Sequence, residues 1–192
     1  MKIIAFNIIA SKNVGLGHLY RAITLAQGLQ NYNIVFFCEA NSYAVTKSIS
    51  KNKFQLIRYN KNNLIGKIKI LNPDLLINDI LNTTEKYMNA LSFLHIKTLN
   101  FEDLGEGSKF ASLVINELYD NPVNSNNNVL WGHEYFCLRE EFVKSKPNKY
   151  REKLKNILIT FGGTDQHNLT LKILNKISHV CKEYKIKIYV VT

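Results

Sequence analysis

Short apolar runs alternate with amphipathic helical segments along most of the chain, and no other feature of the sequence limits the possible folds as strongly. The first run, residues 3–9, is apolar and rich in β-branched side chains, as expected of a strand buried on both faces of a parallel sheet. Residues 18–29 follow with apolar side chains at helical spacing, namely Leu19, Ala22, Ile23, Ala26 and Leu29. The chain therefore opens with a strand, a loop and a helix.

The same pattern repeats through residue 115. Further strands are predicted at 34–38, 54–59, 75–77, 96–101 and 113–115. Helices are predicted between them at 43–49, 64–71 and 87–94, and Thr83 or Thr84 can cap the last of these. This alternation predicts an α/β fold built on a right-handed, mostly parallel sheet.

A polar, basic and proline-containing segment, 144–151, is the best candidate for a domain boundary. Beyond it, a strand, a glycine-rich turn, a helix and a strand are predicted at 157–161, 162–165, 169–180 and 186–191. These elements are too few for a sheet of the usual size. We therefore predict an N-terminal domain over 1–150 and, over 151–192, the start of a truncated second domain.

The net charge of +10 and the pI near 9.4 raise the question of nucleic-acid binding, because Lys and Arg bind phosphate backbones. The lysines, however, are scattered along the whole chain and rarely form a block. This distribution favours a solvated basic surface, so we expect no nucleic-acid partner. A basic cleft that attracts a small polyanion, such as a nucleoside diphosphate, is the intermediate alternative.

The cysteines and the N-terminus exclude other classes. Cys38, Cys137 and Cys181 lack the spacing of a metal or redox motif, and each is expected to be a small buried hydrophobic residue without a disulfide. The apolar N-terminal run is short and is broken by Asn7, and no later run approaches the roughly 20 residues that span a bilayer. We expect a soluble, cytoplasmic protein with no membrane span.

Polar clusters follow three of the predicted strands, at Gly15–Arg21, Asn78–Asp79 and Glu102–Asp103. In parallel sheets, ligands bind beyond the carboxyl ends of the strands. We therefore expect these clusters to share one edge of the sheet and to line a cleft.

The first cluster has the composition of an anion-binding turn. Gly15 and Gly17 allow backbone N–H groups to approach a ligand, and the helix N-terminus that follows adds a partial positive charge. His18 and Arg21 add a titratable group and a cation beside the bound anion.

Several motifs occur in a fixed order along the chain. The first is G-x-G-H-x-x-R at 15–21, followed by Ala22, Leu25 and Ala26. The others are at 76–79, 100–103, 113–116, 131–142, 161–165 and 168–170. In this order they resemble the UDP-sugar hydrolases of pseudaminic acid biosynthesis. That family is related to spore-coat polysaccharide proteins and, more remotely, to glycosyltransferases of the GT-B type, which have two Rossmann-like domains.

The resemblance implies a GT-B-type, Rossmann-like fold, with a catalytic domain over 1–150 and the beginning of a nucleotide-binding domain over 151–192. It implies hydrolysis of a UDP-linked 2,4-diacetamido-trideoxy sugar to UDP and the free sugar, with inversion and without a metal or cofactor. His18 matches the family's essential histidine. An imidazole titrates near neutral pH, which suits a general base that activates the attacking water.

Other residues of the first domain receive roles from the same resemblance. Asp79 and Asp103 match acidic positions and are expected to orient His18 or to bind the sugar, and a helix cap or turn is the alternative role. Arg21 is expected to pair with an acid or with a phosphate. Arg139 is expected to be a structural link to the domain junction, and a substrate role is the alternative.

The turn of the second domain matches the loop that begins the family's nucleotide-binding domain. Its expected substrate-binding residues are Gly162, Gly163, Thr164, Asp165 and Asn168. The family's uridine- and diphosphate-binding residues lie mostly beyond residue 192. We therefore expect this chain alone to bind UDP poorly and to need its missing C-terminal half or a partner chain.

One departure from the family leaves the activity open. Leu81 stands where the hydrolases usually carry a tyrosine that is credited with substrate binding. The alternatives are a GT-B-like glycosyltransferase of polysaccharide synthesis and a truncated, non-catalytic module that binds a sugar nucleotide. Turnover of a UDP-sugar without an acceptor, and its loss in His18→Ala, distinguishes these functions.

Overall fold

The computed structural model of the 192-residue chain describes residues 1–11, 15–51, 53–120, 122, 126–146, 152–161, 165 and 167–191. The chain divides into two compact units. The first unit comprises Met1–Ala10 and Gly17–Val143, and the second comprises Ser11–Leu16 and Lys144–Thr192.

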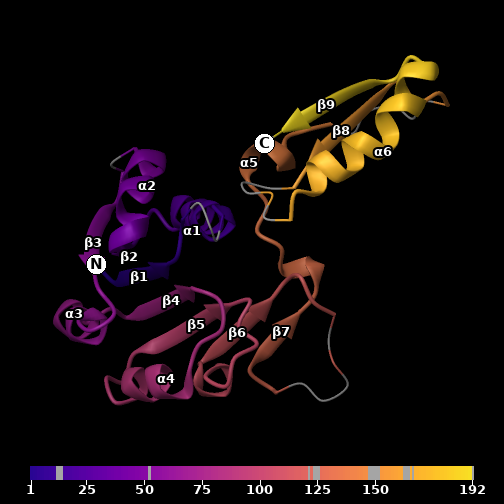
Figure 1. Cartoon of the computed structure of the whole chain (residues 1–192). Helices are drawn as coiled ribbons and strands as arrows, with labels where there is room; N and C mark the ends of the chain where they lie inside the picture. The colour runs from indigo at the N-terminus through magenta and orange to yellow at the C-terminus, as the bar shows by residue number, and fades with distance from the viewer. Residues whose placement is uncertain are drawn as a thin grey trace. The chain divides into compact units, whose positions relative to one another are not determined.

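Among the described residues of the first unit, seven strands form one sheet in which neighbouring strands are parallel (Figure 1). They are β1 (Ile3–Ile8), β2 (Asn33–Glu39), β3 (Gln55–Tyr59), β4 (Leu75–Asp79), β5 (Lys97–Phe101), β6 (Leu113–Asn116) and β7 (Val129–Trp131). Their order across the sheet is β3-β2-β1-β4-β5-β6-β7. The predicted parallel α/β sheet is confirmed. Strands β1 to β3 follow one another toward one edge of the sheet and β4 to β7 toward the other edge, so the strand order reverses between β1 and β4.

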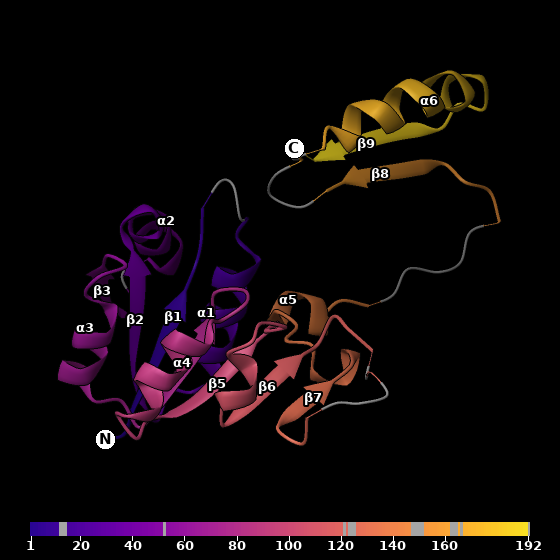
Figure 2. The ribbon, with the colours of Figure 1, turned by 60° about the horizontal axis from the view of Figure 1, so that its bottom comes forward.

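Helices cover both faces of this sheet, with α1 and α2 on one face and α3 and α4 on the other (Figures 1 and 2). Their bounds are Gly17–Gly28 for α1, Ala40–Ser50 for α2, Leu64–Leu71 for α3 and Glu85–Ser92 for α4. Together with the strands, α3 and α4 form an apolar cluster of buried side chains, namely Ala5, Phe37, Leu64, Ile68, Leu76, Met88, Leu91, Ile96, Ala111 and Val114. On α1, the buried side chains are Leu19, Ala22, Ile23 and Ala26, four of the five apolar positions in the predicted helix.

Thr84 is the residue that caps α4. Its Oγ1 accepts a hydrogen bond from the backbone N–H of Tyr87 at 3.2 Å, which satisfies one donor of the first helical turn. Of the two threonines that the sequence offers as caps, Thr83 instead lies buried with a different partner, described below.

The segment after β6 is the part of the first unit that the sequence pattern does not predict. β7 is a three-residue, half-buried strand that pairs with β6. Three residues are too few to show the alternation of apolar and polar side chains that distinguishes a strand from a loop. Short helical turns precede and follow these two strands, at η1 (Ser108–Phe110), η2 (His133–Tyr135) and α5 (Glu140–Val143).

A row of buried asparagine side chains crosses the middle of the sheet. Asn7 Nδ2 on β1 donates to Asn78 Oδ1 on β4 at 3.2 Å, and Asn78 Nδ2 donates to Asn100 Oδ1 on β5 at 2.9 Å. The hydroxyl of Tyr87 on α4 also donates to Asn78 Oδ1, at 2.8 Å. These hydrogen bonds give the amides partners inside an apolar sheet, although Asn7 Oδ1 has none among the described residues. Asn78 is therefore the centre of a polar network inside the core.

The second unit contains β8 (Asn156–Thr160), α6 (Leu169–Glu183) and β9 (Lys187–Val191). The two strands are parallel and α6 connects them (Figure 2). The carboxylate of Asp165 satisfies donors of the first turn of α6, because it accepts hydrogen bonds from the backbone N–H groups of Leu169 at 2.8 Å and Thr170 at 2.7 Å. This strand–helix–strand order agrees with the predicted one.

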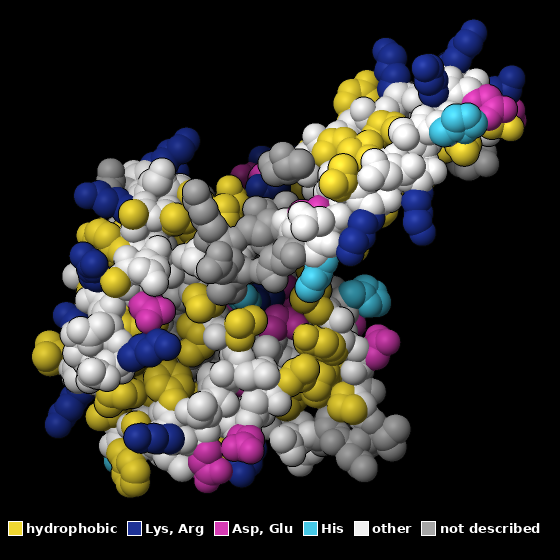
Figure 3. All heavy atoms as spheres, viewed as in Figure 1, with side chains coloured by type: hydrophobic (Ala, Val, Ile, Leu, Met, Phe, Trp, Pro, Cys, Tyr) yellow, Lys and Arg dark blue, Asp and Glu magenta, His cyan; other side chains and the backbone are white. Residues whose placement is uncertain are grey.

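The surface agrees with the expected scatter of positive charge. On the face drawn in Figure 3, Lys and Arg side chains are spread over both units and do not gather in one patch. None of the helices among the described residues is both long enough and apolar enough to cross a membrane. The three cysteines are free thiols, and burial raises the pKa of Cys38 to about 11.

We expect Asn78→Ala to lower the free energy of unfolding by about 2–4 kcal/mol, because Asn7, Asn100 and Tyr87 would each lose a partner inside the core. Urea unfolding followed by circular dichroism measures this change. The matched control is Asn62→Ala, an exposed asparagine on the surface, which should change stability by less than about 0.5 kcal/mol. Equal effects of the two substitutions would contradict a structural role for the asparagine row.

Candidate active site

The candidate site lies at the carboxyl edge of the sheet, at the point where the strand order changes direction. β1 and β4 are neighbours there, and their last residues, Ile8 and Asp79, are paired in register. The chain leaves β1 toward α1 and leaves β4 toward α4, and these two helices cover opposite faces of the sheet (Figure 1). In open parallel sheets, ligands bind beyond the strand ends at such a change of direction. The first turns of α1 place His18 and Arg21 beside Asp79 at the end of β4.

His18, Arg21 and Asp79 meet at this position. His18 Nδ1 is 2.5 Å from Asp79 Oδ1, and Arg21 donates from Nη2 to Oδ1 at 2.7 Å and from Nε to Oδ2 at 2.8 Å. The side chain of Asp79 is 1% exposed and that of His18 is 13% exposed. An ionised carboxylate only accepts hydrogen bonds, so Nδ1 is the protonated nitrogen of His18. In the neutral imidazole, Nε2 then carries the lone pair.

Arg21 connects Asp79 to two glutamates. Its Nη1 is 2.5 Å from Glu117 Oε1 and 3.7 Å from Glu102 Oε1, and its guanidinium lies 4.8 Å from the centre of the Phe101 ring. Burial by itself lowers the pKa of Arg21, but the hydrogen bonds and charges of Asp79 and Glu117 raise it above its ordinary value. The sequence left two roles open for Arg21, pairing with an acid and binding a phosphate. In the structure, the donors of Arg21 face carboxylates, as in the first of these roles.

Glu102 is held in a backbone conformation that non-glycine residues rarely adopt. Its φ is 51°, its backbone N–H donates to the carbonyl of Ile115 at 2.9 Å, and its Oε1 accepts from the backbone N–H of Glu117 at 2.7 Å. Burial raises the pKa of Glu102 above its ordinary value, although the hydrogen bond from Glu117 and the charge of Arg21 oppose this rise. Glu102 thus connects the ends of β5 and β6.

Asp103 lies outside this cluster and none of its described contacts is with His18, which corrects the expectation that it orients His18 directly; sugar binding by Asp103 stays a prediction. Its side chain accepts hydrogen bonds from Thr83 N at 2.9 Å, Thr83 Oγ1 at 2.6 Å, Asn100 Nδ2 at 2.7 Å and Gly105 N at 3.0 Å. The residue is 2% exposed. Asp103 therefore makes the contacts expected of a turn residue, and it joins the loop after β5 to the loop before α4.

The opening glycines have different surroundings. Gly15 has a φ of 90°, which favours glycine, and its N–H donates to the carbonyl of Ser11 at 2.8 Å. Gly17 is exposed and begins α1. Residues 12–14 lie outside the described residues, so contact between this turn and a ligand remains a prediction.

The predicted residues of the second unit are only partly described. Gly162, Gly163 and Thr164 lie outside the described residues. The carboxylate of Asp165 is taken up by the first turn of α6, and Asn168 precedes that helix with a φ of 52°. Substrate binding by this turn remains a prediction.

Arg139 contacts aromatic rings and a carboxylate of the first unit, and its expected role as a link to the domain junction stays a prediction. Its guanidinium lies 5.1 Å from the ring centre of Tyr20 on α1 and 4.8 Å from that of Phe142 on α5. Its Nη1 also pairs with Glu141 Oε1 at 3.1 Å. Arg139 therefore joins α5 to α1.

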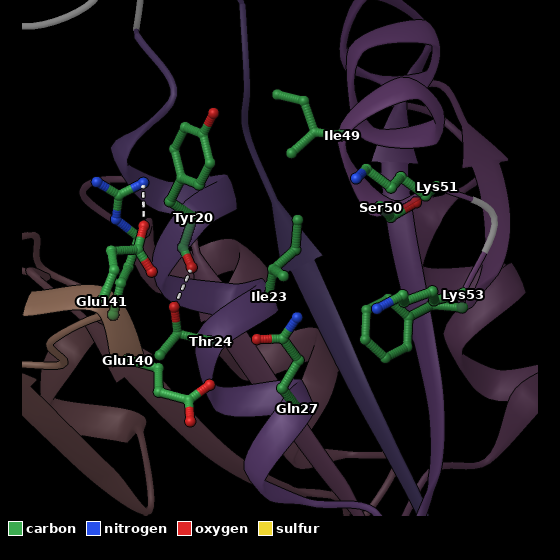
Figure 4. Close-up of a pocket in the computed structure, with 12 residues that line it drawn as sticks. Tyr20, Ile23, Thr24, Gln27, Ile49, Ser50, Lys51, Lys53, Glu140 and Glu141 are labelled. Carbon is green, nitrogen blue, oxygen red and sulfur yellow. Dashed lines mark hydrogen bonds and ion pairs between the residues drawn. The ribbon is translucent and has the colours of Figure 1, made fainter. Parts of the chain in front are cut away.

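A separate hollow of about 420 Å³ lies between α1, the end of α2 and α5 (Figure 4). Tyr20, Ile23 and Gln27 line one side, and Lys51 and Lys53 line the other. His18 and Asp79 are not among its lining residues, so this hollow is distinct from the cluster at the ends of β1 and β4.

Glu117 is the site residue that the sequence reasoning missed. It follows Asn116 directly, at the end of β6, and its side chain is 4% exposed. The rule that selected Asp79, a polar residue at the carboxyl end of a predicted strand, applies equally to Glu117. A contact with Arg21 across 96 positions of sequence, however, gives no local signal.

Comparison with known proteins gives distant relatives. No protein-family model matches the chain. It is 32% identical over 195 residues to an uncharacterized protein of Methanocaldococcus jannaschii, covering 93% of this chain and 40% of that protein. It is 28% identical over 174 residues to the spore coat polysaccharide biosynthesis protein SpsG of Bacillus subtilis, covering 83% of this chain and 50% of SpsG. The chain thus spans half or less of the length of these curated relatives.

The fold has a counterpart among solved structures. The crystal structure of MurG from Acinetobacter baumannii matches with a TM-score of 0.56 at 14% identity, over 100% of this chain and 67% of MurG. MurG has the GT-B fold. The first unit is therefore a Rossmann-like sheet of the GT-B type, as predicted, and the chain is distantly homologous to SpsG.

We expect Arg21→Gln to destabilise the protein by about 3–5 kcal/mol, because it leaves buried carboxylates of Asp79 and Glu117 without their cation. Thermal or urea unfolding measures the loss. The control is Arg139→Gln, which removes a partly exposed pair with Glu141 and should change stability by less than about 1 kcal/mol. A loss at Arg21 as small as that at Arg139 would show that the buried ion pairs contribute little.

We also expect Glu102 to make stability depend on pH. Its pKa is raised in the folded protein, so the folded state binds this proton more tightly than the unfolded chain does. Its contribution to stability is complete below the ordinary glutamate range and is lost as the pH rises through the raised pKa. Unfolding free energies measured at about pH 4 and about pH 7 should therefore differ less in Glu102→Gln than in Glu106→Gln, an exposed control. An identical pH dependence in both variants would refute this assignment.

Proposed function

We propose that this chain carries the base-bearing part of a GT-B-type, sugar-nucleotide-dependent enzyme of polysaccharide biosynthesis, with His18 as the general base. The observation that carries the proposal is the 2.5 Å contact between His18 Nδ1 and the buried carboxylate of Asp79. That contact fixes the tautomer and the ring orientation, and a fixed Nε2 lone pair is what a general base requires.

The chemistry follows from this arrangement. A hydroxyl group at Nε2 gives its proton to His18 while its oxygen attacks the anomeric carbon of the sugar nucleotide. The bond from that carbon to the diphosphate oxygen breaks, and the nucleoside diphosphate leaves with the electron pair. Asp79 stabilises the imidazolium that forms. Attack opposite to the leaving group inverts the anomeric configuration.

Transfer to a sugar hydroxyl is the favoured form of this reaction. Its support is the GT-B fold, shared with MurG, and the distant homology to SpsG, a protein named for spore coat polysaccharide biosynthesis. The basic composition of the chain suits a diphosphate-bearing substrate. In this proposal the first unit activates the acceptor, and the second unit contributes to nucleotide binding.

Hydrolysis is the second candidate, and the motif at 15–21 favours it. The same base then activates water, and the substrate is a UDP-linked 2,4-diacetamido-trideoxy sugar, as the resemblance to pseudaminic acid hydrolases implies. Leu81, which takes the place of the hydrolases' tyrosine, has a φ of 69° and is 48% exposed two positions after Asp79. An apolar side chain there has no hydroxyl to donate, so sugar recognition would differ from that of the hydrolases.

The protein expressed from its complete reading frame should release UDP from one member of a panel of UDP-sugars, as measured by chromatography. His18→Gln should lower this turnover by about 10²–10⁴-fold, because proton removal by a positioned base contributes that much. His133→Gln, at an exposed histidine of the same unit, is the control and should retain activity. Release that requires an added saccharide acceptor identifies a transferase, and release into water alone identifies a hydrolase. Full activity of His18→Gln would falsify the proposed base.

A further inference from the structure

We propose that Glu117 is a positioning residue for His18, because its charge balances Arg21 and thereby leaves Asp79 able to hold the imidazole through Nδ1. The inference rests on the proposed role of His18 as a base. It assigns a function to a buried carboxylate that contacts neither His18 nor, in the proposed reaction, the substrate.

The first step of the argument is that Asp79 is shared. Arg21 contacts both of its oxygens, at 2.7 and 2.8 Å, and His18 Nδ1 contacts Oδ1, which Arg21 already occupies. A carboxylate attracts an imidazole N–H less strongly when a guanidinium neutralises its negative charge than when that charge is not neutralised. An unbalanced Arg21 would therefore weaken the bond that orients His18.

The second step is that Glu117 supplies the balance. Its Oε1 lies 2.5 Å from Arg21 Nη1, the nitrogen that does not contact Asp79. Glu102 is farther from the same nitrogen, at 3.7 Å, and burial raises its pKa, so Glu117 is the principal counter-charge on this side. Both pairs are buried, where screening by water is weak.

The third step is that Glu117 is itself fixed in place. Its Oε2 accepts a hydrogen bond from the backbone N–H of Cys137 at 3.2 Å, and its own backbone N–H donates to Glu102 Oε1 at 2.7 Å. The carboxylate thus cannot follow Arg21 if the guanidinium moves toward Asp79. A continuous series of contacts therefore runs from Cys137 through Glu117, Arg21 and Asp79 to His18.

The test replaces the charge of Glu117 and keeps its shape. In Glu117→Gln the amide oxygen can still accept from Arg21, but the negative charge is gone. We expect the low-field NMR signal of the His18 Nδ1 proton to move upfield and to exchange faster with water. The ring nitrogens of His18, labelled with ¹⁵N, should report a mixture of tautomers in the variant where the wild-type protein has one. Glu106→Gln, at an exposed glutamate in the loop after β5, should leave both signals unchanged.

Cys137 provides an independent reading of the same charge. Burial raises the pKa of this thiol first, and the charge of Glu117 raises it further. Loss of that charge should lower the thiol pKa, so that Cys137 in Glu117→Gln reacts severalfold faster with iodoacetamide at mildly alkaline pH. Peptide mass spectrometry separates this reaction from those of Cys38 and Cys181.

The combined outcomes decide the proposal. Faster alkylation of Cys137 together with a changed His18 spectrum in Glu117→Gln supports it, provided that the amide spectrum shows an intact fold. Faster alkylation with an unchanged His18 spectrum overturns it, because Glu117 would then be charged but not coupled to the imidazole. Unchanged alkylation also overturns it, because Glu117 would carry no charge to remove. Neither reading needs substrate, so failure here is separate from loss of the proposed catalytic activity.

Discussion

One buried guanidinium organises the carboxyl edge of this sheet. Arg21 extends from α1 to Asp79 at the end of β4 and to Glu117 at the end of β6, with Glu102 close by. Burial of a carboxylate without a partner raises the free energy of the folded state, and a single cation shared among several carboxylates offsets that cost. Removal of that cation would leave negative charges of neighbouring strands facing one another. The positions of these strand ends, and of His18, therefore depend on Arg21.

The asparagine row complements this cluster from inside the sheet. Asn7, Asn78 and Asn100 connect β1, β4 and β5 just before the strands end, and Asn100 continues the row to Asp103. Hydrogen bonds between side chains have narrower geometric requirements than apolar contacts, so the row defines how neighbouring strands align. Asp79 directly follows Asn78, so this alignment also sets the position of Asp79. A base whose partner is displaced by about 1 Å loses much of its effect.

The same arrangement of His18 and Asp79 is compatible with more than one acceptor. A general base acts on the nucleophile, and water and a sugar hydroxyl present the same O–H group to it. In the proposed reaction, the choice between hydrolysis and transfer would therefore depend on what the surrounding surface admits, including Leu81, and not on His18. A fold can carry several chemistries, so the proposed role of His18 as a base rests on the site, while the fold and the homology to SpsG support only the class of enzyme.

Much of the fold was predictable because it rests on local patterns. Apolar runs and helical spacing, such as that of Leu19, Ala22 and Ile23, indicated the order of strands and helices in both units. β7 was not predictable, since three half-buried residues carry no period of their own and are a strand only through pairing with β6.

The sequence by itself determined the parallel α/β class and the candidate base, because periodicity and a G-x-G-H turn are readable from neighbouring residues. Only the tertiary structure decided between the two aspartates, since Asp79 and Asp103 both follow a strand but just one of them meets His18. It alone revealed Glu117, 96 positions from Arg21. The physical reason is that a buried charge selects its partner by proximity in three dimensions, and sequence separation carries no trace of that distance.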